Sequence, residues 1–143
     1  MEEIRGRVLA LDFGSRRIGV AVSDPLGITA QQLSAIRREG DRKDIEAIAA
    51  MVGEYGVETV VIGLPLLPAG TEGTQAAKVR QFALKVHDRL GLPVVPWDER
   101  FTTAQAERHL IESGVRREKR REVRDSLAAA LLLQSALDAR NRK

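Results

Sequence analysis

The chain of 143 residues contains no cysteine, only two histidines and few aromatic residues. Without cysteine it can form neither disulfides nor thiolate zinc sites, and His87 and His109 do not have the spacing of zinc ligands. Aromatic residues make up only 3% of the chain, which disfavours a nucleic-acid surface built on base stacking. Any bound metal ion would therefore be held mainly by carboxylates, the ligands that Mg²⁺ and Mn²⁺ prefer.

Long apolar runs are also missing. The longest one, residues 127–133, is far too short to cross a membrane, and the N-terminal Met-Glu-Glu lacks the basic-then-apolar pattern of a signal peptide. We therefore expect a cytoplasmic protein that does not interact with membranes. The length is that of one domain, and we predict a single domain over residues 1–143.

Positive charge is concentrated in one segment, although the net charge is only +3. Residues 116–124 contain six Arg or Lys, among them Arg116, Arg117 and Arg120, against two Glu. Such a segment either attracts the phosphates of a nucleic acid or forms a solvated helix face, and charge alone leaves both interpretations open.

Hydrophobic periodicity predicts a mixed α/β protein. Apolar and β-branched runs indicate strands, 3.6-residue spacing indicates helices, and Gly56 and Gly91 follow two of those helices as left-handed caps would. The first three strands form a hairpin with an extension, whereas the later strands alternate with helices and so pair in parallel. This order predicts a five-stranded mixed sheet with helices on its faces. The strands are expected at 6–13, 17–22, 28–37, 57–63 and 93–97, and the helices at 41–52, about 79–90, 102–114 and 122–139.

Acidic residues follow two of the predicted strands. Asp12 ends the first strand, which is apolar on both faces, and Asp98-Glu99 follow the fifth strand. Asp125 falls in the first turn of the predicted last helix, where a carboxylate suits the helix dipole. Parallel strands bring their carboxyl ends together, so these acids are expected to converge.

Each acid alone also has an ordinary explanation as a turn, cap or first-turn residue. Asp12 is the hardest to explain in that way, because an ionised group on a buried strand needs a partner or a metal to offset its desolvation. Three converging carboxylates without a nucleophile motif favour one or two divalent cations that activate water against a phosphodiester. Gly63, after the fourth strand, either lines a substrate phosphate or belongs to a plain surface loop.

Four ordered motifs carry a resemblance to a known family. They are LDFGSRRIGVAVSD (11–24), VVIGLP with the following GTEGTQAAKVRQF (60–82), DERFTTAQAE (98–107) and RDSLAAALLLQSALD (124–138). Together they cover nearly the whole chain, which resembles the YqgF/RuvX family of Holliday junction resolvases and pre-16S ribosomal RNA nucleases.

The resemblance implies an RNase H-like fold and assigns the catalytic and metal-binding acids to Asp12, Glu99 and Asp125. It also implies that Arg17 and Arg100 meet phosphates, although ordinary surface arginines are an equally good explanation. Related resolvases place an acid after the strand that here ends in Gly63-Leu64-Pro65, and this sequence has none there. The second ligand is then Asp98 or Glu99; strand alternation does not choose between them, and we favour Glu99 for its longer reach.

These observations predict a nuclease that uses Mg²⁺ or Mn²⁺ on structured nucleic acid, chiefly in 5′-end maturation of pre-16S rRNA. One alternative is a Holliday junction resolvase acting on branched DNA, which would need two active sites; the sequence leaves monomer and homodimer open. Another is a non-catalytic RNA-binding assembly factor that uses only the basic surface. A third is an actin-like or sugar-kinase ATPase, whose phosphate-binding hairpin the first motif also resembles.

Overall fold

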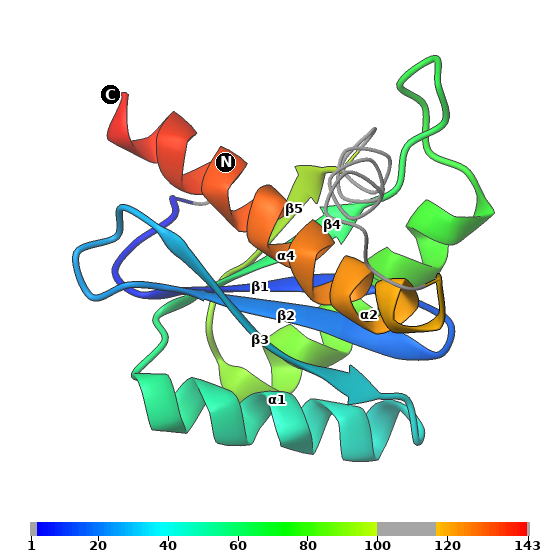
Figure 1. Ribbon diagram of the computed structural model, residues 1–143, viewed down its shortest axis with the longest axis horizontal. Helices are drawn as coiled ribbons and strands as arrows, with labels where there is room; N and C mark the ends of the chain where they lie inside the picture. The colour runs from blue at the N-terminus through cyan, green and yellow to red at the C-terminus, as the bar shows by residue number, and fades with distance from the viewer. Residues whose placement is uncertain (1–2, 100–116, 143) are drawn as a thin grey trace.

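The computed structural model describes residues 3–99 and 117–142, and for residues 117–125 it describes the backbone alone. This part of the chain forms a five-stranded sheet with helices on both faces (Figure 1). The strands are β1 (Val8–Phe13), β2 (Arg17–Ser23), β3 (Ala30–Arg37), β4 (Thr59–Leu64) and β5 (Val94–Asp98). The helices are α1 (Asp41–Tyr55), α2 (Thr74–Leu90) and α4 (Arg117–Asn141).

The sheet has the strand order β3-β2-β1-β4-β5. β2 runs antiparallel to both β1 and β3, whereas β4 is parallel to β1 and β5 is parallel to β4. The predicted mixed sheet is therefore confirmed, with the hairpin on one side of β1 and the parallel strands on the other. β1 is central, which explains why Val8, Leu9, Ala10 and Leu11 are all fully buried.

The two faces of the sheet have different cores. α1 and α2 cover one face, and α4 crosses the other (Figure 1). The α1/α2 core contains large side chains such as Phe82, Ile48 and Ile62. The α4 core is built from smaller ones, with Ala129 and Ala136 beside Leu132 and Leu133. Because strand side chains alternate between faces, each strand residue belongs to one core or the other.

Both helices of the α1/α2 face end as predicted. Gly56 and Gly91 take the left-handed conformation, with φ of 63° and 68°, directly after α1 and α2. The amide of Gly91 donates to the carbonyl of His87, so a carbonyl at the helix end is paired. Only glycine adopts this backbone without strain, which is why the sequence located both helix ends.

The last helix is longer than predicted. It begins at Arg117 rather than near Glu122, so the basic segment is largely its first turns and not a separate connection. Arg, Lys and Glu are good helix formers, and neither Gly nor Pro occurs between 117 and 141, so nothing in the sequence stops the helix there. Asp125 lies in the third turn, and the prediction that it occupies the first turn is wrong. The predicted helix 102–114 lies outside the described residues.

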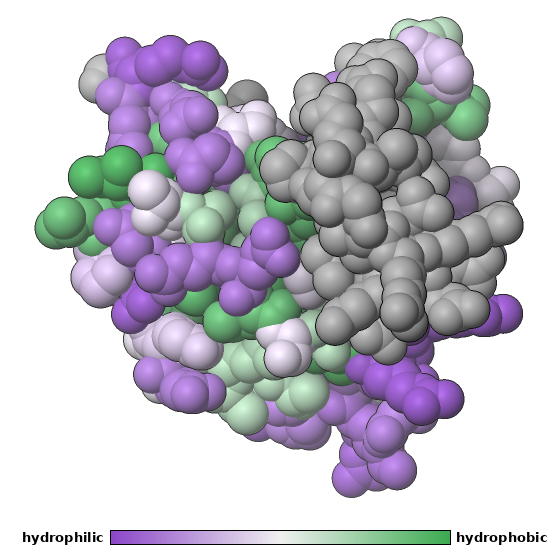
Figure 2. All heavy atoms as spheres, viewed as in Figure 1, coloured by the Kyte–Doolittle hydropathy of each residue, from purple (hydrophilic) through white to green (hydrophobic). Residues whose placement is uncertain are grey.

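Within the described ranges, no helix is both long enough and apolar enough to pass through a membrane. Figure 2 shows the α4 face of the molecule, where hydrophilic side chains surround smaller apolar patches. Among the large apolar side chains that are described, Leu26 in the β2–β3 turn (80%) and Leu84 in α2 (63%) have the largest exposed fractions.

Candidate active site

Asp12 lies near the carboxyl end of β1, on the face that α4 covers. It alternates with Val8 and Ala10, both of which belong to the α4 core. In the β1–β2 pairing Asp12 stands directly opposite Gly19. Its side chain is half-buried, so the carboxyl group is partly removed from water beside an apolar core.

Glu99 approaches Asp12 from the far side of β4. Its backbone amide donates to the carbonyl of Leu64 at 3.4 Å, which continues the parallel pairing of β4 and β5 by one residue. Val95 and Trp97, four and two residues earlier, pack in the α4 core. Alternation therefore puts Glu99 on the same face as Asp12.

Asp98 falls on the opposite face. It pairs in register with Leu64 and alternates with Val94, which packs in the α1/α2 core. The sequence left Asp98 and Glu99 as alternatives because the end of β5 was not fixed. With the register of β5 in place, the structure brings Glu99, and not Asp98, to the face of Asp12.

Gly63 provides the space in which the Glu99 carboxyl group lies. A Cβ atom at Gly63 would overlap Oε2 of Glu99 and would sit 3.0 Å from its Cδ and 3.3 Å from Cδ2 of Leu132. Gly63 is in β4, which is hydrogen-bonded to both β1 and β5. The structure thus differs from the expectation that Gly63 lines a substrate phosphate, because the space is taken up by the chain's own carboxylate.

The two carboxyl groups form a side-chain hydrogen bond, which requires a proton between them. Burial first, and then the negative charge of Asp12, the hydrogen bond to it and the charge of Asp98, raise the pKa of Glu99 from 4.5 to about 9. A divalent cation, with its larger charge, would compete with a proton for these carboxyl oxygens.

The third predicted acid, Asp125, is described by its backbone only. It precedes Ser126, whose hydroxyl donates to the carbonyl of Leu33 in β3 at 2.8 Å. Among the residues whose side chains are described, no group of three His, Cys, Asp or Glu is arranged to hold a metal ion. The structure thus brings together Asp12 and Glu99, and the part of Asp125 in the site stays a prediction.

The predicted basic residues are distributed unevenly. Arg17 opens β2, and Arg117 and Arg120 lie in the first turn of α4, where only the backbone is described. Arg100 and Arg116 lie outside the described residues.

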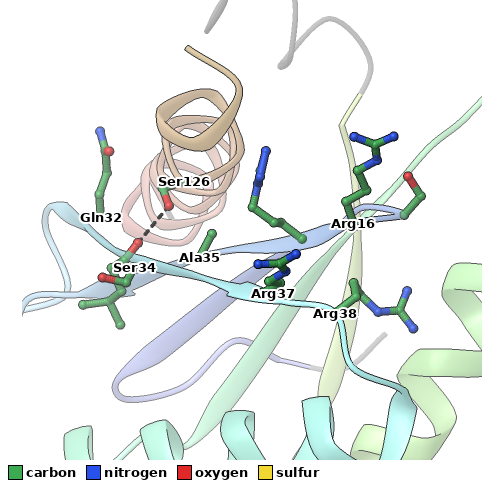
Figure 3. Close-up of a pocket in the computed structure, with 10 residues that line it drawn as sticks. Arg16, Gln32, Ser34, Ala35, Arg37, Arg38 and Ser126 are labelled. Atoms are coloured by element: carbon green, nitrogen blue, oxygen red, sulfur yellow. Dashed lines mark hydrogen bonds between the residues drawn. The ribbon is translucent and has the colours of Figure 1, made fainter. Parts of the chain in front are cut away.

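Sequence reasoning missed a basic groove beside the acids. A cavity of about 1010 Å³ lies between α4 and the β2–β3 edge of the sheet (Figure 3), and its arginines are Arg16, Arg17, Arg37 and Arg38. These residues come from two sequence segments twenty residues apart, each with two adjacent arginines. That doubling was the available signal, but only the strand pairing reveals that the two segments meet.

The strand order and the helices on both faces of the sheet define an RNase H-like fold, as predicted. The same fold occurs in Thermus thermophilus RuvC in complex with a Holliday junction substrate, with a TM-score of 0.60 at 17% identity over 97% of this chain and 98% of that one. It also occurs in the fowlpox virus resolvase bound to Holliday junction DNA, with a TM-score of 0.55 at 12% identity over 93% of this chain and 97% of that one.

The chain belongs to the RuvX family, described as Holliday junction resolvases, whose model matches residues 6–139. A relative from Syntrophus aciditrophicus is 53% identical over 93% of this chain and 89% of its own length, and one from Desulforamulus reducens is 47% identical over 93% and 97%. Both carry the name "Putative pre-16S rRNA nuclease". The family membership predicted from the four motifs is confirmed.

Proposed function

We propose that this single-domain chain is a cytoplasmic nuclease that uses a divalent metal ion to hydrolyse phosphodiester bonds in the precursor of 16S ribosomal RNA. The observation that carries the proposal is the hydrogen-bonded pair of Asp12 and Glu99 beside Gly63. Two carboxyl groups that face each other repel when both are ionised, and an acid with a strongly raised pKa is typical of a functional site.

The donor set fits Mg²⁺ or Mn²⁺. Carboxylate oxygens are the ligands of hard cations, and Asp12 and Glu99 would hold the ion together with Asp125 as the proposed third ligand. A bound divalent cation lowers the pKa of a water molecule and stabilises the charge that develops on a leaving oxygen. The protein's own contribution is to keep Glu99 in the space at Gly63, opposite Asp12, so that both carboxylates face one point.

The basic residues complete this proposal. Five arginines are proposed to contact the phosphates of the substrate. They are Arg17, on the same strand as Gly19, Arg117 and Arg120 at the start of α4, and Arg100 and Arg116. Their positive charge would offset the repulsion between a polyanion and the acid pair. Affinity would then decrease steeply with salt concentration.

An RNA substrate is favoured by the names of the relatives that are about half identical to this chain. A four-way DNA junction is the second candidate, supported by the description of the family. Junction resolution needs two cuts and hence two active sites, so it favours a homodimer, whereas RNA processing is compatible with a monomer. A non-catalytic RNA-binding factor would use the basic residues without the acids.

The test is a cleavage panel with Mn²⁺ or Mg²⁺ on a 5′-extended 16S precursor, a single-stranded RNA and a four-way DNA junction. Asp12→Asn should lower metal-dependent cleavage by more than the roughly 10–100-fold that loss of an outer-shell partner costs. Glu58→Gln, an exposed acid at the opposite end of the sheet, is the control and should leave the rate unchanged. Equal cleavage rates for wild type and Asp12→Asn would reject the proposal. If the wild type binds the RNA but does not cleave it, the result would favour the non-catalytic assembly factor.

A further inference from the structure

The groove beside the acid pair has an unusual charge balance. Four of the ten residues that line it are arginines, and none of these ten is acidic. Arg38 is already engaged, because it donates to Asp44 at 2.8 Å and to Asp41 at 2.7 Å. Arg16 and Arg37 form no salt bridge with any residue in the described ranges, and both are exposed. Two positive charges of the groove thus face solvent and are not paired with an acid of the described residues.

The strand pairing places two arginines of the groove directly opposite each other. Arg17 of β2 stands directly opposite Arg37 of β3 in the antiparallel register. Like charges at directly opposed positions of an antiparallel pair are destabilising. Arg38, next along the chain, packs its guanidinium 4.4 Å from the centre of the Phe13 ring in the α1/α2 core, so alternation sends Arg37 to the α4 face. In Figure 3 the side chain of Arg38 accordingly extends away from Arg37.

The groove and the acid pair share one face of the sheet. In β2, Ile18 and Val20 belong to the α1/α2 core and Ala21 to the α4 core, so Arg17 and Gly19 face α4. Gly19 is the residue opposite Asp12. From Asp12 to Arg37 the path crosses two strand spacings and shifts by two residues along β2, which together make about 12 Å. One strand of a nucleic acid carries a charge about every 3.4 Å along the helix axis, so this path matches about three phosphates.

The other described walls of the groove are mainly polar, with Leu33 and Ala35 as the apolar residues. The hydroxyl of Ser126 in α4 donates to the carbonyl of Leu33 and so joins the helix to β3 along the groove (Figure 3). Gln32, Ser34 and Ser15 add neutral hydrogen-bonding groups along the lining. Cationic and neutral donors without a large apolar surface suit a sugar–phosphate backbone rather than an apolar peptide or exposed bases.

We propose that this groove binds the backbone of one nucleic-acid strand as it leaves the acid pair, with Arg16, Arg17 and Arg37 contacting about three successive phosphates on one side of the scissile bond. The proposal rests on the proposed function, because the acid pair defines where that bond lies. It extends the substrate-binding surface from the start of α4 to the β3 edge of the sheet. Arg16 and Arg37 enter it as new substrate-binding residues.

The first test measures binding without cleavage. In the Asp12→Asn background, Arg16→Gln/Arg37→Gln is compared with Arg42→Gln/Lys43→Gln, which removes the same charge from exposed positions of α1 on the other face. The probes are a 12-nucleotide single-stranded RNA and a four-way DNA junction over a salt series. The groove variant should bind at least about tenfold more weakly, and the slope of log affinity against log salt should decrease by about 1.4 to 1.8, as expected for two lost phosphate contacts. Equal losses in both variants would overturn the proposal.

The second test locates the contacts relative to the cut. Substrates are shortened one nucleotide at a time on either side of the scissile bond, and cleavage by the wild type and by Arg37→Gln is compared. The effect of Arg37→Gln on KM should vanish once about three nucleotides are removed from one side and persist for truncation on the other. Persistence on both sides would overturn the assigned path. If the wild type cleaves none of the substrates, the proposed function is rejected. The binding test still shows whether the groove binds nucleic acid.

Stability separates a binding role from a structural one. Because Arg37 opposes Arg17, Arg37→Gln should leave the unfolding midpoint unchanged or raise it slightly. A lower midpoint together with weaker binding would mean that Arg37 supports the fold and would contradict the proposal.

Discussion

Two acids on opposite faces of the sheet are compensated in different ways. Asp44, on the α1/α2 face, is only 1% exposed, and its carboxylate accepts from Nε of Arg38 at 2.8 Å and from the backbone amide of Glu39 at 2.9 Å. Glu99, on the α4 face, has Asp12 and Asp98 as the charged groups that shift its pKa. The first acid is held by a cation and a backbone amide, whereas the groups that shift the pKa of the second include two further acids.

This difference separates an acid with a structural role from one that we propose to be functional. A buried carboxylate with several donors helps to fix the fold, and Arg38 also donates to the carbonyl of Gly14, so the Asp44 cluster holds the β1–β2 turn beside α1. A carboxyl group whose pKa is raised by neighbouring acids is stabilised by a proton or by an ion from solution. The structural acid thus lies on one face of the sheet and the proposed site on the other.

The largest expected effect on stability comes from removing the carboxylate of Asp44. Asp44→Asn leaves the guanidinium of Arg38 without its buried partner and should lower the free energy of unfolding by about 3 kcal/mol. Denaturant unfolding measures this, with Glu46→Gln as the control. Glu46 forms an exposed pair with Arg89, and its loss should have no measurable effect. A loss for Asp44→Asn as small as for Glu46→Gln would remove the contrast between the two faces.

The raised pKa of Glu99 should make the stability of the protein depend on pH. The pKa of Glu99 is raised from 4.5 to about 9, so the folded protein keeps a proton that the unfolded chain releases above pH 4.5. Its contribution to stability is therefore fully present below pH 4.5 and is lost as the pH rises toward 9. Glu99→Gln has no such proton, so in EDTA it should match the wild type near pH 5 and become the more stable protein near pH 8.

Unfolding free energies of both proteins at pH 5, 7 and 8 check this expectation. Parallel curves for wild type and Glu99→Gln would mean that the acid pair does not hold a proton. Added Mg²⁺ or Mn²⁺ should restore stability at pH 8 in the wild type and less so in the variant, because binding to the folded state alone stabilises it.

The sequence was sufficient for the fold because the signals were local. Apolar and β-branched runs identified the strands, 3.6-residue spacing identified helices, and the glycines at 56 and 91 identified two helix ends. The order of these elements predicted the mixed pairing. Asp12 stood out because an acid on a fully apolar strand is rare. The start of α4 was misplaced because the charged segment was taken as a connection, although its residues are good helix formers.

The parts of the site that depend on register were beyond the sequence. Choosing Glu99 over Asp98 required the residue at which β5 pairs with Leu64. Gly63 could be explained only once the side chain of Glu99, directly after β5, was seen to lie against it. The basic groove could be recognised only from the pairing of Arg17 with Arg37. These are contacts between segments that are 20 or more residues apart, which local patterns do not encode.

The smallest expected effect on stability contrasts two glycines. Gly63→Ala adds a methyl group where the carboxyl group of Glu99 lies. Because the end of a long side chain can move, stability should fall by only about 1 kcal/mol, the lower end of the cost of overpacking. The displaced Glu99 should nevertheless lower metal-dependent cleavage by at least about tenfold, the range of losses when the support of a metal ligand is removed. Gly53→Ala is the matched control, because no atom lies within 4 Å of a Cβ at this position of α1. It should leave cleavage unchanged and raise stability by about 0.5–1 kcal/mol, since alanine is the better helix former. Cleavage kinetics and denaturant unfolding of both variants test this prediction. Wild-type activity in Gly63→Ala would mean that the space at Gly63 does not position Glu99. Loss of activity in Gly63→Ala but not in Gly53→Ala would link the missing side chain of β4 to the acid pair.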